Sequence, residues 1–181
     1  MQNLAPIALF VYNRPDHTRR TLKFLQQNWL ADESRLFIFS DAAARPVDNQ
    51  KVAEVRELLN AVSGFKKVEV INRKINFGLA NSIIDGVNRM VKEYGKVIVF
   101  EDDLISSPHT LQYFNSALSR YQNENKVMHI GAYMYPIQNS PKNNNDKCLP
   151  ETFFYRAATS WGWATWQRAW NDFEPDINIL I

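Results

Sequence analysis

The sequence is short of several features, and each shortage excludes a class of protein. It holds one cysteine, Cys148, among 181 residues, so no disulfide can form within the chain and a reducing compartment fits. No apolar run approaches the roughly 20 residues that a membrane-spanning helix needs, so we expect no transmembrane segment. The first apolar run lacks a basic region before it and is interrupted by Asn13 and Arg14, which is unlike a signal peptide.

A strong excess of one charge is also missing. Lysine and arginine number 21 and acidic residues 19, which gives a net charge of +2. Because binding to a phosphate backbone usually requires a large basic excess, we do not expect nucleic acid as a partner. Apolar residues make up 45% of the chain, enough for a folded core, and the length predicts a single domain over residues 1–181.

Short apolar runs alternate with segments of helical spacing. The runs predict buried strands at Ile7–Tyr12, Leu36–Ser40, Val68–Ile71, Lys96–Phe100 and Val127–Ala132, with a further strand at Thr152–Arg156. The runs are continuous rather than alternating, which is typical of a parallel sheet with both faces covered by helices. The sequence therefore predicts an α/β fold in which the polar residues that follow strands gather at one edge of the sheet.

Three acids follow the fourth strand, in the stretch VIVFEDDLISSP. Adjacent carboxylates repel one another unless a cation neutralises them. Mg²⁺ and similar hard cations bind one or two carboxylates together with the phosphates of a substrate. Glu101, Asp102 and Asp103 therefore form a candidate metal site, with a solvated acidic turn as the alternative.

The longer run VIVFEDDLISSPHTLQYF resembles the metal-binding segment of GT-A-fold glycosyltransferases, closest to N-acetylglucosaminyltransferase I and its bacterial relatives. Three further segments resemble that family in the same order: VYNR at Val11–Arg14, FSD at Phe39–Asp41, and the aromatic segment Phe153–Pro175. The resemblance covers nearly the whole chain. It implies a Rossmann-like GT-A fold with a mostly parallel central sheet and helices on both faces.

The resemblance also implies a UDP-sugar donor and a divalent metal ion, Mn²⁺ or Mg²⁺. Asp103 would be the direct metal ligand. Asp102 would hydrogen-bond the ribose or the donor sugar, and Glu101 would contact the donor. Asp41 would accept the N–H of the uracil ring, and Arg14 would lie near the phosphates.

Three more residues are candidates for the nucleotide-sugar site. Asn76, in the turn NFGL, resembles a similar turn in bacterial family-2 transferases. Trp161 is a candidate for contact with the sugar, because Gly162 beside it would let the backbone approach a ligand closely. Other tryptophans, Trp163, Trp166 and Trp170, are spaced as one helical face and are interpreted as core residues.

The catalytic base is not assigned. In the family it is an Asp shortly after a Glu-Pro pair, whereas here Glu174-Pro175 is followed by six residues. We therefore expect a chain truncated at its C-terminal end. The resemblance implies an inverting transfer to a carbohydrate or lipid-linked glycan acceptor in bacterial surface polysaccharide or lipopolysaccharide synthesis. The expected place is the cytoplasm, with peripheral contact to the inner face of the membrane.

Two alternative functions stay open at this point. A non-catalytic module would bind a nucleotide sugar without turning it over. A sugar nucleotidylyltransferase would also use a metal and a nucleotide, but such enzymes carry a Gly-rich loop after the first strand. The corresponding stretch here, YNRPDHT, has no glycine.

Overall fold

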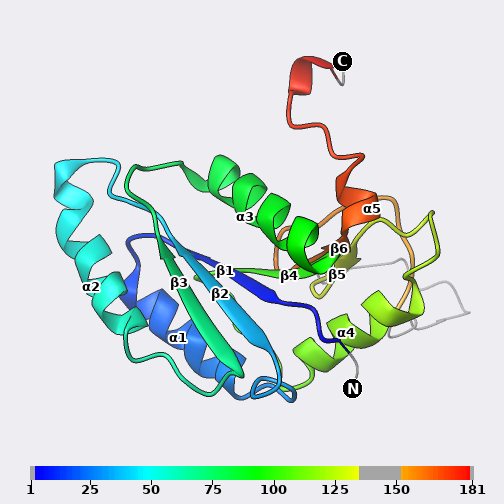
Figure 1. Cartoon of the computed structure of the whole chain (residues 1–181), viewed down its shortest axis with the longest axis horizontal. Helices are drawn as coiled ribbons and strands as arrows, with labels where there is room; N and C mark the ends of the chain where they lie inside the picture. Colours follow the sequence, from blue (N-terminus) through cyan, green and yellow to red (C-terminus); the bar gives the residue numbers. More distant parts are fainter. Residues whose placement is uncertain (1–2, 135–151, 180–181) are drawn as a thin grey trace, which may run out of the picture.

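A computed structural model of the chain describes residues 3–134 and 152–179, and Figure 1 shows its α/β architecture. Six strands form one sheet in the order β3-β2-β1-β4-β6-β5. Their bounds are Ile7–Val11 (β1), Arg35–Ser40 (β2), Lys67–Asn72 (β3), Lys96–Glu101 (β4), Ile130–Gly131 (β5) and Trp163–Trp166 (β6). The α-helices are Pro15–Gln26 (α1), Asn49–Leu59 (α2), Leu79–Tyr94 (α3), Thr110–Arg120 (α4) and Gln167–Trp170 (α5), and two 3₁₀ turns span Pro46–Asp48 (η1) and Ile177–Ile179 (η2).

The first four strands of the chain, β1 to β4, are parallel to one another. The other two strands run antiparallel: β6 pairs with β4, and β5 pairs with β6. Parallel strands need crossover connections, and α1, α2 and α3 supply them. The expected α/β fold with a mostly parallel sheet and helices on both faces is confirmed.

Each central strand contributes side chains to two cores, one on each face of the sheet. Ile7 and Leu9 of β1 belong to the core covered by α1, α2 and α4, whereas Ala8 and Phe10 belong to the core covered by α3. Successive side chains of a strand point to opposite faces, so a strand buried on both sides must be apolar throughout. This is the physical reason for the continuous apolar runs.

The helix α3 lies close against the sheet at Gly86. A Cβ atom at this position would come within 2.5 Å of the Phe10 ring. That ring is stacked on Phe39, with the ring centroids 5.0 Å apart, so it has little room to move aside. The missing side chain at Gly86 therefore permits the packing of α3 on β1 and β2.

The aromatic segment near the C-terminus differs from the prediction of a helical face. Trp163 and Trp166 lie in strand β6, where residues three apart point to opposite faces, and Trp170 ends the short helix α5. The interpretation of Trp163 and Trp166 as core residues is confirmed, with one in each core. Pairing with β4 determines the strand, and local spacing does not reveal that pairing.

Two expected strands also differ from the structure. The segment Val127–Ala132 contains a strand of two residues, Ile130–Gly131. Thr152–Arg156 is exposed and irregular, because it lies outside the sheet and has no ladder to join. Cys148 lies outside the described residues.

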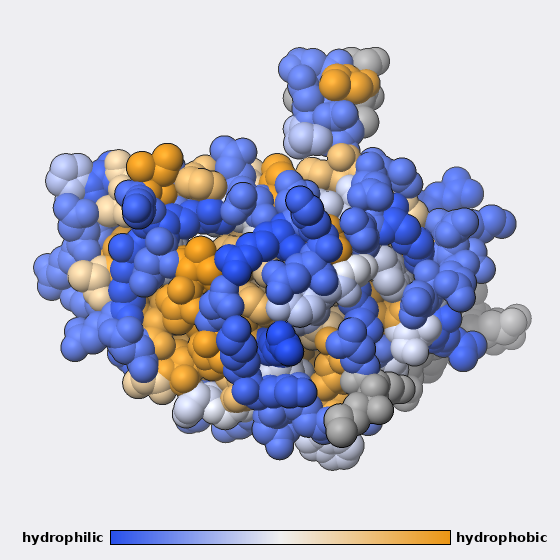
Figure 2. All heavy atoms as spheres, viewed as in Figure 1, coloured by the Kyte–Doolittle hydropathy of each residue, from blue (hydrophilic) through white to orange (hydrophobic). Residues whose placement is uncertain are grey.

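The surface shows hydrophobic residues along one edge of the sheet. Figure 2 shows them over the edge strand β3, in which Val68, Val70 and Ile71 are half-buried. The last described residues, beyond α5, lead away from the body of the molecule (Figures 1 and 2). None of the helices that the structure describes has the length and apolar character needed to cross a membrane.

Candidate functional site

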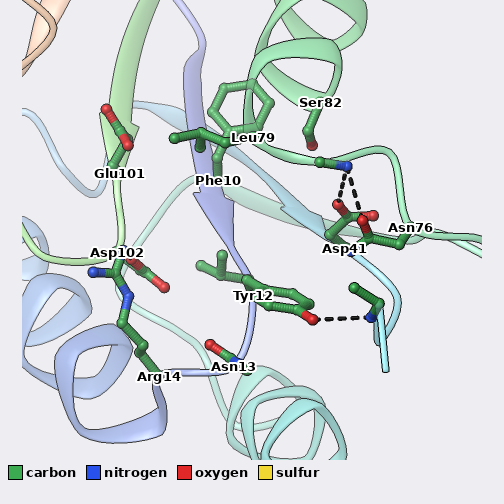
Figure 3. A pocket seen from close by; sticks show the side chains of 13 residues that line it. Phe10, Tyr12, Asn13, Arg14, Asp41, Asn76, Leu79, Ser82, Glu101 and Asp102 are labelled. Carbon is green, nitrogen blue, oxygen red and sulfur yellow. Dashed lines mark hydrogen bonds and ion pairs between the residues drawn. The ribbon is translucent and has the colours of Figure 1, made fainter. Parts of the chain in front are cut away.

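The carboxyl ends of β1, β2 and β4 surround a cavity of about 350 Å³ (Figure 3). These strands are parallel, so the residues that follow them meet at the same edge of the sheet. The lining includes five of the residues predicted from the sequence: Arg14, Asp41, Asn76, Glu101 and Asp102. The expected gathering of polar residues at strand ends is confirmed, while the role of each residue stays a prediction.

Arg14 supplies a positive charge to two of the three acids, Asp102 and Asp103. Its Nη2 forms an ion pair with Asp102 Oδ1, and its Nη1 contacts Asp103 Oδ2 at 3.0 Å. The Asp102 side chain is 3% exposed, and its main-chain carbonyl accepts a hydrogen bond from the Thr21 hydroxyl at 2.8 Å. The other carboxylate oxygen of Asp102, Oδ2, is buried without a hydrogen-bond partner among the described residues.

Burial is the main influence on the pKa values of two carboxyls at this site, those of Glu101 and Asp102. Burial raises the pKa of the Glu101 carboxyl, and the charges of Asp103 and Asp102 raise it further, while Arg14 acts in the opposite direction. Burial also raises the pKa of Asp102 and outweighs the effect of the guanidinium beside it. Burial lowers the pKa of Arg14, but the charges of Asp102 and Asp103 and their hydrogen bonds raise it by more, so the pKa of Arg14 is raised. Both carboxyl shifts favour the protonated forms, and a nearby positive charge would act in the opposite direction.

The donor chemistry of the triplet suits a hard divalent cation. Asp102 Oδ2 is a buried carboxylate oxygen without a partner in the described chain, and Asp103 is 41% exposed beside it. Carboxylate oxygens together with substrate phosphates are the usual ligands of Mg²⁺. Within the described residues, however, there is no group of three or more His, Cys, Asp or Glu side chains arranged to hold a metal ion by themselves. Two carboxylates here would therefore need a further oxygen donor.

Asp41 uses its carboxylate to hold the turn that follows β3. Its Oδ1 accepts the main-chain N–H groups of Ala42 at 2.9 Å and Phe77 at 3.0 Å, and its Oδ2 accepts those of Phe77 at 3.1 Å and Gly78 at 3.0 Å. Asn76 completes the link, since its Nδ2 donates to the Ala42 carbonyl at 2.6 Å and its Oδ1 accepts from Gly78. Asp41 thus fastens one rim of the cavity (Figure 3).

Arg73 supports the same turn, and sequence reasoning missed it. Its side chain is 6% exposed, forms an ion pair with Asp85 at 2.9 Å and lies over the Phe77 ring at 4.0 Å. Arg56 connects the ends of β2 and β3, because it donates hydrogen bonds to the main-chain carbonyls of Asp41 and Arg73. Arg73 follows β3 directly, so the strand-end criterion that selected Asp41 would have found it.

Tyr12 and Ser82 also line the cavity without having been predicted. The Tyr12 hydroxyl accepts the Ala44 N–H at 2.9 Å, which holds the loop after β2 against the end of β1. Ser82 is buried in the first turn of α3 and contacts Arg73. Tyr12 lies two residues before the predicted Arg14, so its place at the end of the first strand was the available signal. No such signal marked Ser82, because the turn that brings the start of α3 to the cavity is held by contacts with distant residues.

Trp161 and Gly162 lie outside the lining of this cavity within the described part of the chain. Trp161 is 44% exposed and its ring centroid is 4.6 Å from that of Tyr133. Gly162 has a positive φ of 72°, and a Cβ there would lie 4.0 Å from Leu104, next to Asp103 in the chain. The two residues therefore stand near the segment after the acids, and their roles remain predictions.

Comparison with known proteins gives one family. The GNT-I family model matches residues 1–178. No curated protein matches the chain. The similar solved structures include S. aureus TarS, which has 15% identity and a TM-score of 0.47 over 65% of this chain and 20% of that one. They also include the mannosyltransferase PcManGT from Pyrobaculum calidifontis, in complex with GDP-Man and Mn²⁺, which has 13% identity and a TM-score of 0.46 over 75% of this chain and 39% of that one. The chain thus spans about a fifth of TarS and two fifths of PcManGT.

Proposed function

Since the chain belongs to the GNT-I family, we propose that it is the donor-binding part of a metal-dependent glycosyltransferase that takes a sugar from a UDP-sugar. One observation carries the proposal. The cavity at the carboxyl ends of the parallel strands brings Arg14, Asp41, Asn76, Glu101 and Asp102 together from four separate parts of the chain. Ligands of open α/β sheets bind at this edge.

The cavity has two chemically different ends. The acids and Arg14 form a charged end, which suits a diphosphate and a divalent cation. The turn Asn76–Gly78, held by Asp41, forms the other end. Two of its main-chain N–H groups and the Asn76 amide are already bonded within the protein, and no cationic side chain of the described residues lines the cavity there, so a neutral nucleobase fits this end better than a diphosphate does. We assign the diphosphate to the first end and the uracil to the second. Because the Asp41 carboxylate already accepts several N–H groups, its contribution to the base includes positioning this turn.

Asp103 would hold the cation, Mn²⁺ or Mg²⁺. We propose that Asp102 also contacts the cation, instead of the ribose contact that the resemblance implies, because its Oδ2 is buried without a partner among the described residues. When bound, the cation neutralises the charge that develops on the diphosphate as the bond to the sugar breaks. Glu101 lies at the end of β4, where its side chain lines the cavity beside the acids. Its proposed part is to contact the donor and keep it oriented. Trp161 and Gly162 are proposed to contact the donor sugar, beyond the segment that follows Asp103.

The wider biological role rests on the resemblance to N-acetylglucosaminyltransferase I and its bacterial relatives. We propose an inverting transfer to a carbohydrate or lipid-linked glycan acceptor, in bacterial surface polysaccharide or lipopolysaccharide synthesis. The proposed location is the cytoplasm, with peripheral contact to the inner face of the membrane.

The proposal is tested by calorimetric titration of UDP into the protein with and without Mn²⁺. We expect binding that depends on Mn²⁺ and that Asp103→Ala reduces by at least about tenfold, because the variant removes a carboxylate from the cation. Asp32→Ala is the matched control, since Asp32 is an exposed acid between α1 and β2. Absence of UDP binding to folded wild-type protein would overturn the proposed donor site.

A further inference from the structure

One guanidinium occupies the two carboxylates that the proposed cation would contact. The two terminal nitrogens of Arg14 bind different residues, Nη2 at Asp102 and Nη1 at Asp103. Asp102 is buried, so it needs a nearby positive charge to stay ionised. A divalent cation at the same oxygens would repel the guanidinium strongly, because the two positive charges would lie within a few ångströms of each other.

We propose that Arg14 is the resident counter-cation of the acidic site, and that it moves to the diphosphate of the donor when a divalent cation replaces it on Asp102 and Asp103. The inference rests on the proposed function, since the incoming diphosphate is that of the donor. It makes cation binding and diphosphate binding interdependent. The cation displaces Arg14 from the acids, and the diphosphate accepts the displaced guanidinium.

The surroundings of Arg14 allow its side chain to move while its backbone stays in place. The Arg14 carbonyl accepts hydrogen bonds from the N–H and the hydroxyl of Thr18, both at 2.9 Å, which fix it to the first turn of α1. Its side chain is 44% exposed and lines the cavity. The exchange therefore needs a rotation of one side chain, and no rearrangement of the helix.

The backbone at Asp102 is held in place independently of Arg14. The Asp102 carbonyl accepts the Thr21 hydroxyl, which ties the backbone of the triplet to α1. The partnerless Oδ2 of Asp102 is a further carboxylate oxygen beside the one that Arg14 binds. A doubly charged ion compensates two carboxylates better than a single guanidinium does.

The test measures Mn²⁺ binding alone, without nucleotide, by titration monitored through the EPR signal of free Mn²⁺. We expect weak binding to the wild type and binding at least about tenfold tighter to Arg14→Gln, which removes the competing cation. Arg14→Lys keeps a positive charge and should bind Mn²⁺ nearly as weakly as the wild type. Arg19→Gln is the matched control, because it removes the same charge from an exposed pair with Asp16 and should leave Mn²⁺ affinity unchanged.

A second titration adds UDP, with the Mn²⁺–UDP complex measured in a protein-free blank. UDP should tighten Mn²⁺ binding to the wild type, and should do so much less in Arg14→Gln. Mn²⁺ binding to Arg14→Gln no tighter than to the wild type would overturn the inference. If Arg14→Gln does not fold, the titrations of the wild type test the inference. Tight Mn²⁺ binding to the wild type without UDP, with no further tightening when UDP is added, would overturn the inference as well.

The two proposals fail in different ways. If UDP does not bind the wild type at all, the donor site is wrong, whatever Mn²⁺ does. If UDP binds with Mn²⁺ as expected but Arg14→Gln leaves both Mn²⁺ titrations unchanged, the donor site stands and the role of Arg14 as counter-cation is wrong.

Discussion

Glu101 differs from its two neighbours in the triplet, because Asp102 and Asp103 share the guanidinium of Arg14. Glu101 is half-buried, and burial together with the adjacent acids raises its pKa above the ordinary value of 4.5. The folded protein therefore favours the protonated form, and the stability that this contributes is lost as the pH rises through the raised pKa. An ionised Glu101 is a source of instability at neutral pH.

From this we predict that Glu101→Gln raises the Tm at pH 7 by a few degrees. The glutamine has nearly the same shape but no charge to keep near the aspartates. The difference between variant and wild type should shrink as the pH falls through the raised pKa, and should disappear well below 4.5, where the wild-type carboxyl is protonated in both states. Thermal unfolding followed by circular dichroism at several pH values measures it. Glu57→Gln, on the exposed face of α2, is the control, and a pH-independent gain would contradict the explanation.

Asp41 gives a second prediction for a single residue. Replacing it by alanine removes the acceptor for the N–H groups of Phe77 and Gly78, and we expect a loss of about 1–3 kcal/mol in the free energy of unfolding. Asp41→Asn keeps one acceptor oxygen and should lose less. Urea denaturation measures both, and Asp32→Ala, at an exposed acid, should be close to wild type. Equal stability of wild type and Asp41→Ala would mean that the turn holds without this carboxylate.

Among the elements, α3 depends on its close approach to the sheet. Gly86→Ala places a methyl group within 2.5 Å of a Phe10 ring that is stacked on Phe39, so ring or helix must shift. We predict a loss of about 1–3 kcal/mol despite the better helix propensity of alanine. Urea denaturation checks this, with Lys92→Ala on the exposed face of the same helix as control. A stabilised Gly86→Ala would show that the packing gives way easily.

The central parallel strands followed from the sequence because β1, β2 and β4 are buried on both faces and show this as unbroken apolar runs. The end of α3 could also be predicted, since Gly95 adopts the left-handed conformation expected of a helix stop. Strand β6 could not be predicted from the sequence. Its residues Trp163–Trp166 become a strand by pairing with Lys96–Val99, a partner more than 60 positions earlier in the chain.

The same distinction applies to the cavity. Residues next to strand ends, such as Arg14 and Asp41, could be placed from the topology alone. The partners of these residues could not be predicted. A carboxylate after a strand looks the same in sequence whether it accepts main-chain N–H groups or contacts a ligand. The bonds of Asp41 to the turn at Phe77 and Gly78, and the sharing of Arg14 between two aspartates, depend on segments brought together by the fold.

For the whole molecule, the two cores share the central strands. Leu111 of α4 belongs to one core and Met90 of α3 to the other, and both are fully buried. We predict that Leu111→Ala and Met90→Ala each lower the free energy of unfolding by about 2–5 kcal/mol. Both should do so in one cooperative transition with an unchanged denaturant slope, since neither core can persist without the strands of the other. Two separate transitions would show that the layers unfold independently.

The antiparallel strand β6 has a consequence for the order in which the protein is made. The acid-bearing strand β4 is flanked by β1 on one side and by β6 on the other. A ribosome completes β1 and β4 long before it reaches Trp163–Trp166, so β4 is an open edge for the intervening residues. A nascent chain that extends beyond β4 can assemble its parallel strands, but the strand that leads to the acids gains its second neighbour only when translation has passed Trp166.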